Sequence, residues 1–262
     1  QQLNYITANH EDLVSALTGC TALVHAAGAD PRIVPKGRAD TFFHDINVTA
    51  NQRLLVAAIE AKVTVTVLLT SYFHPLRPHM KSHPYVASRI ASEAAAMALD
   101  SAGDIRVVIL QPPYVFGAIP GRTTLGDNFA LAARIPLLLP HGGTNAIGVS
   151  DFASAICGAI EKEVHGAFLV GDENLSWPDL FARFGGRAWL LPTFLLTIVM
   201  TCAKAALWLV RRQAGLDPVS LVPTITSEMY FDPAASQEAL GYTRGNLSKA
   251  IASITEKQSP EQ

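Results

Sequence analysis

The sequence is poor in cysteine and in charge. Its 262 residues include three cysteines, Cys20, Cys157 and Cys202, which stand far apart and match no metal-binding or redox spacing. We therefore expect ordinary buried thiols in a reducing, cytoplasmic compartment. Charged residues make up 16% of the chain and the net charge is −2, so nothing in the composition indicates nucleic-acid binding.

The chain also has no initiator methionine, no signal-peptide pattern at its start and no internal repeat. Apolar residues account for 49% of it, which argues against a disordered protein and allows a sizeable core. The length fits one large domain, or one domain with a smaller lobe.

Short apolar runs alternate with helix-like segments in the first half of the chain. These runs predict strands at 21–28, 63–70 and 105–110, and helical spacing of apolar residues predicts helices at 47–62 and 85–102. Strands that alternate with helices indicate an α/β fold with a parallel sheet, and nearly continuous apolar strands indicate that both sheet faces are covered.

Weaker patterns follow in the second half of the chain. They predict strands at 145–149 and 166–170 and helices at 127–134, 151–161, 177–184, 236–240 and 247–255.

Tyr85 and Arg89 stand four residues apart at the start of the expected helix 85–102, so they share one helix face. The hydroxyl of Ser71, at the end of the preceding strand, can approach that face. A cation beside a phenol favours the phenolate, which suits proton exchange with an alcohol or a carbonyl. The alternative is a tyrosine packed on a loop, followed one turn later by a solvated arginine.

Eight motifs, taken in order, resemble the extended short-chain dehydrogenase/reductase family, also called NAD-dependent epimerase/dehydratases. The motifs are Leu17–Gly28, Ile46–Val48, Leu68–Ser71, Tyr85–Arg89, Leu110–Gly117, Gly148–Asp151, Phe231–Pro233 and Leu240–Tyr242. No single motif is specific, but their order and spacing together are. Within the family, the apolar stretch from Trp189 to Val210 looks most similar to the 3β-hydroxysteroid and sterol dehydrogenase branch.

The resemblance implies a Rossmann-type doubly wound parallel sheet with a smaller C-terminal substrate lobe. The dinucleotide-binding domain is expected at 1–113 plus 145–172, and the lobe at 114–144 plus 173–256. The resemblance also implies NAD or NADP as the cofactor. The residues expected to bind it are Ala26, Ala27, Gly28, Asn47, Thr70, Tyr85, Arg89, Pro112 and Val115.

The resemblance further implies hydride transfer between a nicotinamide and a secondary alcohol or ketone, with a sterol-like or other lipophilic substrate. Tyr85 is then the acid/base, Arg89 its electrostatic support and a ribose ligand, and Ser71 the group that orients the substrate oxygen. A nucleotide-sugar epimerase or dehydratase stays open as an alternative. A non-catalytic dinucleotide-binding sensor or scaffold of the same fold is also open, and a homodimer is a family expectation.

The sequence departs from the family pattern in four places. The glycine-rich phosphate loop is absent, and we expect that the chain starts inside a longer domain, by roughly fifty to seventy residues. Arg89 stands where the family has lysine, and an arginine gives charge but cannot lose its proton near neutral pH. The usual hydroxyl donor aligns with Ser71 or with Tyr72, and Gln111 replaces a common arginine.

Several of these residues have ordinary structural interpretations as well. Ser71 can cap the turn at the strand end, and the small residues at 26–28 can serve helix–sheet packing. Asn47 suits a helix N-cap, which is compatible with a place near the cofactor. Pro112 can simply end a strand, and His25 is expected to be a packed strand histidine.

Two further segments invite other interpretations, a metal site and a membrane contact. The spacings of His74, His79 and His83 in a proline-rich loop do not match a zinc site, so we predict no metal and a loop over the substrate mouth. The apolar stretch 189–212 contains a proline, a lysine and threonines. It is therefore expected to be a lobe helix that touches a membrane peripherally, with a core or dimer helix and a true span as alternatives.

Overall fold

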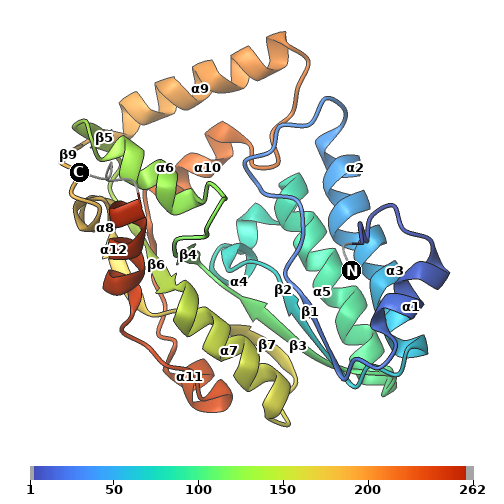
Figure 1. Cartoon of the computed structure of the whole chain (residues 1–262). Coiled ribbons are helices and arrows are strands. Elements are labelled where there is room, and N and C mark those ends of the chain that lie inside the picture. The colour runs from blue at the N-terminus through green and yellow to red at the C-terminus, as the bar shows by residue number, and fades with distance from the viewer. Residues whose placement is uncertain (1–2, 258–262) are drawn as a thin grey trace. The chain divides into compact units, whose positions relative to one another are not determined.

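The computed structural model describes residues 3–257 (Figure 1). It divides into two compact units. The first unit consists of Gln1–Gln111, Ala159–Phe168 and Ala203–Pro218, and the second consists of Pro112–Gly158, Leu169–Cys202 and Val219–Gln262. The assignment of a cofactor domain and a substrate lobe to particular ranges stays a prediction.

A four-stranded sheet lies at the centre of the first unit, in the order β1-β2-β3-β7. Its strands are β1 (Ala22–His25), β2 (Val65–Leu69), β3 (Arg106–Gln111) and β7 (Gly166–Leu169). The pairs β1–β2 and β2–β3 are parallel, with Val65 opposite both Ala22 and Arg106. The predicted α/β fold with a parallel sheet is therefore confirmed, and the carboxyl ends of β1 and β2 meet at one edge of the sheet.

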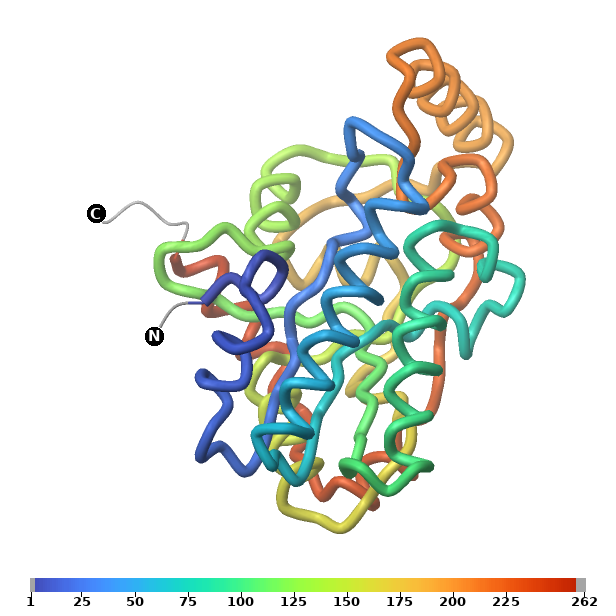
Figure 2. The backbone as a smooth tube through the Cα atoms, turned by 90° about the vertical axis from the view of Figure 1, so that its right-hand side faces the viewer, coloured from blue at the N-terminus to red at the C-terminus, as the bar shows by residue number. Residues whose placement is uncertain are grey.

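Helices α3 and α5 run side by side along the sheet of the first unit (Figure 2). The helices of this unit are α1 (His10–Leu17), α2 (Ala39–His44), the π-helical turn η1 (Asp45–Thr49), α3 (Ala50–Glu60), α4 (Phe73–Leu76), the 3-10 helix η2 (Pro78–Ser82) and α5 (Pro84–Ala102). Leu55 of α3 and Ala96 of α5 join Leu68, Val107 and Ile109 of the strands in one buried core. This packing fixes the face of α5 that carries Tyr85 and Arg89.

Helix α5 is limited by two residues whose backbone preferences suit those positions. Pro84 occupies its first turn, where a missing N–H is no loss. Gly103 follows its last residue with a φ of 77°, in the left-handed region that ends many helices.

Two predictions from the sequence were wrong in detail. The helix expected to start at Asn47 starts at Ala39 and continues through η1 into α3, so Asn47 is not an N-cap. The three cysteines, expected to be buried, are all exposed.

The second unit contains two smaller sheets. In the first of them β6 lies between β10 and β4 and also pairs with β8 antiparallel, and in the second β5 pairs with β9. The strands are β4 (Tyr114–Phe116), β5 (Leu137–Leu139), β6 (Gly143–Gly148), β8 (Glu173–Ser176), β9 (Ala188–Leu190) and β10 (Glu228–Met229). The helices are α6 (Leu125–Ala132), α7 (Val149–Glu161), α8 (Trp177–Arg183), α9 (Thr193–Leu209), α10 (Pro218–Ile225), α11 (Ala234–Leu240) and α12 (Leu247–Lys257), of which α7 and α9 extend into the first unit.

The apolar stretch predicted as one helix forms the short strand β9 followed by α9. Of the 17 residues of α9, only Leu196 is buried, so it is not a core helix. Within residues 3–257, no helix is both long and apolar enough to cross a membrane.

Candidate active site in the first unit

Tyr85 and Arg89 face one another on α5. The guanidinium carbon of Arg89 lies 5.3 Å from the centre of the Tyr85 ring. Both side chains are buried, with 5% and 9% of their surface exposed. The rings of Phe43 and Phe73 meet the Tyr85 ring edge-on, at centroid distances of 5.8 and 6.4 Å. The phenol is thus held between aromatic walls beside a cation, as the four-residue spacing predicts.

The Arg89 guanidinium forms no direct ion pair within the described residues, although its charge helps to lower the pKa of the Asp30 carboxyl. One Nη atom lies 3.5 Å from the carbonyl oxygen of Leu69, and the buried Nε has no partner among the described atoms. A buried cation without a carboxylate in direct contact is unfavourable on its own, so this site suits a bound group with oxygen acceptors.

The turn after β1 lies directly against this guanidinium. A Cβ atom added to Gly28 would come within 2.6 Å of an Arg89 Nη atom, so only glycine allows the present approach. Ala26, Ala27 and Gly28 are exposed, which leaves their backbone open to a ligand. These three residues directly follow the end of β1, and Gly28 among them lies beside Arg89.

Asn47 connects the turn after β1 to α5. Its side-chain oxygen accepts a hydrogen bond from the Ala29 amide at 2.8 Å, and its amide group donates to the Ser88 hydroxyl at 2.8 Å. Ser88 in turn donates to the carbonyl oxygen of Tyr85 at 2.7 Å. A π-helical turn such as η1 is rare and often marks a functional site. Here it presents Asn47 to both partners, and a contact of Asn47 with a cofactor stays a prediction.

The end of β2 brings two hydroxyl groups to the same edge. The Thr70 hydroxyl is buried and has no partner among the described atoms. Ser71 is buried, and its hydroxyl accepts a long hydrogen bond of 3.4 Å from the Phe73 amide. Tyr72, the other residue that aligns with the family's donor, is buried as well. Ser71 thus has the local contact of a turn cap, and its part in orienting a substrate stays a prediction.

Two predicted cofactor ligands belong to the second unit. Pro112 follows β3 directly, and Val115 lies half-buried in β4. Their contacts with a cofactor stay a prediction.

His25, at the end of β1, is a packed histidine. It is 4% exposed, and its ring meets the Tyr5 ring edge-on at 5.0 Å. Burial, with a further contribution from the nearby Arg89 charge, lowers the pKa of His25 to about 4. The neutral imidazole is therefore the form that the folded protein prefers.

This preference predicts a loss of stability in mild acid. The pKa of His25 lies below its unfolded value of about 6.5, so its contribution is complete above pH 6.5 and disappears as the pH falls from 6.5 to 4. The loss should be at most about 3 kcal/mol in the free energy of unfolding, measured by urea titration at a series of pH values.

The variant His25→Leu should remove much of this pH dependence. His44→Leu, at an exposed histidine of α2, is the matched control and should leave the pH dependence in place. If the free energy of unfolding depends on pH equally in His25→Leu and in the parent protein, the protonation of His25 does not cause the loss of stability.

A buried polar cluster follows on the same helix, and the sequence analysis did not identify it. Glu93 of α5 accepts a hydrogen bond from the Gln111 amide at 2.9 Å and lies 3.2 Å from the His74 Nε2. The cluster therefore connects α5 to α4 and to the end of β3. The available signal was the four-residue spacing between Arg89 and Glu93, which places both on one helix face.

The three histidines of the loop do not gather around one point. His83 is buried, which lowers the pKa of its ring, and its Nδ1 accepts a hydrogen bond from the Asp217 amide at 2.9 Å. In the described part of the chain, no three His, Cys, Asp or Glu side chains are placed so that they could hold a metal ion.

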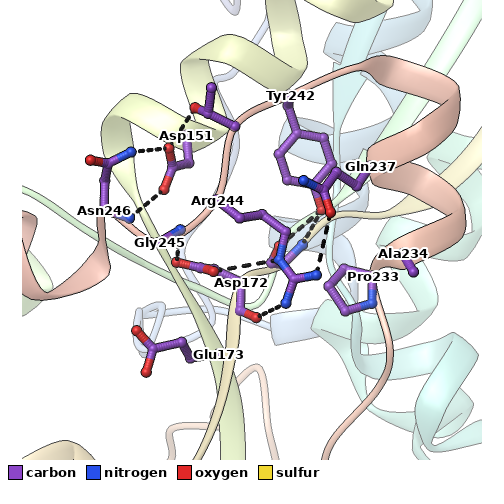
Figure 3. Close-up of polar contacts among 12 residues, drawn as sticks. Asp151, Asp172, Glu173, Pro233, Ala234, Gln237, Tyr242, Arg244, Gly245 and Asn246 are labelled. Carbon is purple, nitrogen blue, oxygen red and sulfur yellow. Dashed lines mark hydrogen bonds and ion pairs between the residues drawn. The ribbon is translucent and has the colours of Figure 1, made fainter.

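A second group of buried polar contacts lies within the second unit (Figure 3). Asp151, at the start of α7, accepts hydrogen bonds from the Thr243 hydroxyl, the Asn246 side chain and the Asn246 amide, at 2.7, 2.7 and 3.0 Å. Asp172 accepts from the Gly245 amide at 3.0 Å, and the burial of its carboxylate raises its pKa. Both carboxylates hold the loop between α11 and α12, and we assign them a structural role.

The profile of the NAD dependent epimerase/dehydratase family matches residues 4–171. A comparison with curated proteins finds no match.

Solved structures with the same fold show low sequence identity. The protein gox2253 has a TM-score of 0.76 and 21% identity, over 95% of this chain and 83% of that chain. A UDP-N-acetylglucosamine 4-epimerase from Bacillus cereus has a TM-score of 0.69 and 17% identity, over 99% and 85%. The Bordetella bronchiseptica enzyme WbmG, solved with NAD and UDP, has a TM-score of 0.68 and 18% identity, over 98% and 79%.

Proposed function

The chain belongs to the NAD dependent epimerase/dehydratase family, and we propose that it transfers a hydride between NAD and a secondary alcohol or ketone. The observation that carries this proposal is the pairing of Tyr85 with Arg89, a buried phenol beside a cation that forms no direct ion pair with a described carboxylate. Their position at the carboxyl ends of parallel strands supports it, because α/β sheets bind ligands there.

The residues present fit a dinucleotide in three respects. The Thr70 hydroxyl and the Arg89 Nε are buried and have no partner within residues 3–257, so both have bonding capacity for a ligand. Ala26 and Ala27, which precede Gly28 in the turn after β1, are exposed. Gly28 leaves room that a side chain would fill. When bound, NAD supplies the hydride-accepting nicotinamide, and the protein supplies placement and charge.

Each of the three predicted catalytic residues has a distinct role in this proposal. Tyr85 takes the hydroxyl proton of an alcohol, or returns a proton to a carbonyl oxygen. Arg89 stabilises the phenolate by its charge and can donate hydrogen bonds to ribose oxygens, but it cannot relay the proton itself. Ser71 orients the substrate oxygen from the end of β2.

A lipophilic alcohol, such as a sterol-like one, is the substrate class that we favour. The exposed apolar helix α9 supports it, because an apolar surface helps a protein to collect such a substrate. The second candidate is a nucleotide sugar, since a UDP-N-acetylglucosamine 4-epimerase has a similar fold. Incubation of the protein and NAD with lipophilic secondary alcohols and with UDP-sugars, followed by NADH absorbance and by analysis of epimeric products, separates the two.

A non-catalytic dinucleotide-binding protein of the same fold is the remaining alternative. Replacement of the family's lysine by Arg89 and of its arginine by Gln111 supports it. NAD binding without turnover of any alcohol or sugar tested would favour this alternative over the enzyme.

The variant Gly28→Ala should weaken NAD binding without unfolding the protein. The added methyl group would lie 2.6 and 2.8 Å from the two Nη atoms of Arg89, and the flexible end of that side chain must move away. We expect an affinity loss of about tenfold by calorimetric titration with NAD, equivalent to about 1.4 kcal/mol. The free energy of unfolding should change by less than about 1 kcal/mol.

Gly37→Ala is the matched control, because an added Cβ meets no atom within 4 Å there. It should bind NAD as the parent protein does. Unchanged NAD affinity in Gly28→Ala would show that the Arg89 guanidinium does not contact the cofactor.

A further inference from the structure

The segment from Arg187 to Arg212 exposes many large apolar side chains to water. Phe194, Ile198 and Trp208 are 65%, 56% and 79% exposed and follow one side of α9 at helical spacing. Leu195, Val199 and Leu209 are also exposed and form the neighbouring row. Trp189, Leu190 and Val210, which flank the helix in sequence, are exposed as well, and so is Leu138, opposite Trp189 in the pair of β5 with β9.

The charges of this region all have one sign. No acidic residue occurs from 180 to 216, although the chain contains 22, and five of its 20 basic residues lie there. Arg183 pairs with Glu173 and Lys204 pairs with Asp217. For Arg187, Arg211 and Arg212, the described residues provide no carboxylate partner. The segment therefore ends in cations at both sides of an apolar helix.

We propose that the segment 187–212 binds the surface of an anionic phospholipid bilayer. The apolar side of α9 would enter the boundary between headgroups and acyl chains, and Arg187, Arg211 and Arg212 would contact the lipid phosphates. Trp189 and Trp208, near the two ends, are the residue type enriched at that boundary. The three arginines are complementary in charge to lipid phosphates, so they favour an anionic lipid surface over an uncharged apolar partner.

Two other occupants fit the observations less well. A second copy of this chain would bring cations of the same sign together across the interface, which opposes association. A membrane-spanning arrangement needs about 20 apolar residues, whereas α9 has 17 and contains Lys204.

Sedimentation with lipid vesicles tests the proposal. The full chain should bind vesicles that contain phosphatidylglycerol and phosphatidylcholine in equal amounts, and should bind pure phosphatidylcholine vesicles at least about tenfold more weakly. High salt should weaken binding to the anionic vesicles as well. Trp208→Glu and Phe194→Glu should each reduce the affinity about tenfold or more, because each places a charge in the apolar contact.

The double variant Arg211→Gln/Arg212→Gln tests the charge term separately and should also lose about tenfold or more in affinity. Val56→Glu, at an exposed apolar residue of α3, is the control and should bind as the parent protein does. Circular dichroism confirms that each variant is folded. Vesicle binding that is absent, or equal for Trp208→Glu and Val56→Glu, would overturn the proposal. So would a dimer that Trp208→Glu dissociates while vesicle binding stays absent.

Discussion

Replacing Tyr85 by phenylalanine should lower the turnover number by about 10²–10⁴-fold while the affinity for NAD stays within about twofold. The phenol hydroxyl is the proposed proton donor and acceptor, and phenylalanine retains the ring that packs against Phe43 and Phe73. The Arg89 guanidinium also retains an aromatic ring beside it. Steady-state kinetics and calorimetric titration with NAD measure the two quantities on the same preparation.

Tyr5→Phe is the matched control for this experiment. The Tyr5 hydroxyl is buried and has no partner among the described atoms, so its removal should leave turnover unchanged. A Tyr85→Phe variant that turns over as fast as the parent protein would remove Tyr85 from the chemistry. A parent protein that never turns over would instead favour the non-catalytic alternative.

The largest expected loss of stability follows from Asp151→Ala. The Asp151 side chain is fully buried and accepts three hydrogen bonds from Thr243 and Asn246 (Figure 3). The variant leaves three donors without an acceptor and a cavity in their place. We expect the free energy of unfolding to fall by about 3 kcal/mol, measured by urea titration at neutral pH.

Asp232→Ala in the same unit is the control. Asp232 is exposed and accepts one hydrogen bond, from the Ala234 amide at 2.9 Å. Its loss should cost less than about 1 kcal/mol. If both variants lower the free energy of unfolding equally, the buried hydrogen bonds of Asp151 stabilise the protein no more than the exposed one of Asp232.

The parts of the fold that follow from local pattern were predicted well. The β-branched run around β2 and the alanine-rich α5 lie within two residues of their predicted limits. The contact of Tyr85 with Arg89 also follows from helix geometry, because a four-residue spacing places both on one face.

Features that depend on tertiary contacts were not predictable in the same way. The π-helical turn around Asn47 satisfies the Ala29 amide and the Ser88 hydroxyl, which lie 18 residues before it and 41 after it. The sequence near Asn47 suits a helix N-cap equally well. Only the hydrogen-bond partners, Ala29 and Ser88, distinguish the two arrangements. The pairing of β5 with β9 was missed because three-residue strands carry too short a pattern.

The connection after α9 has a practical consequence for anyone who shortens the protein to make it easier to handle. The carbonyl oxygen of Gly215 accepts a hydrogen bond from the Tyr85 amide at 3.1 Å, and the Asp217 amide donates to His83 at 2.9 Å. A deletion of α9 that also removed Gly215 and Asp217 would remove both hydrogen bonds from the start of α5, the helix that carries Tyr85. A deletion should therefore end before Gln213, so that these two hydrogen bonds are kept.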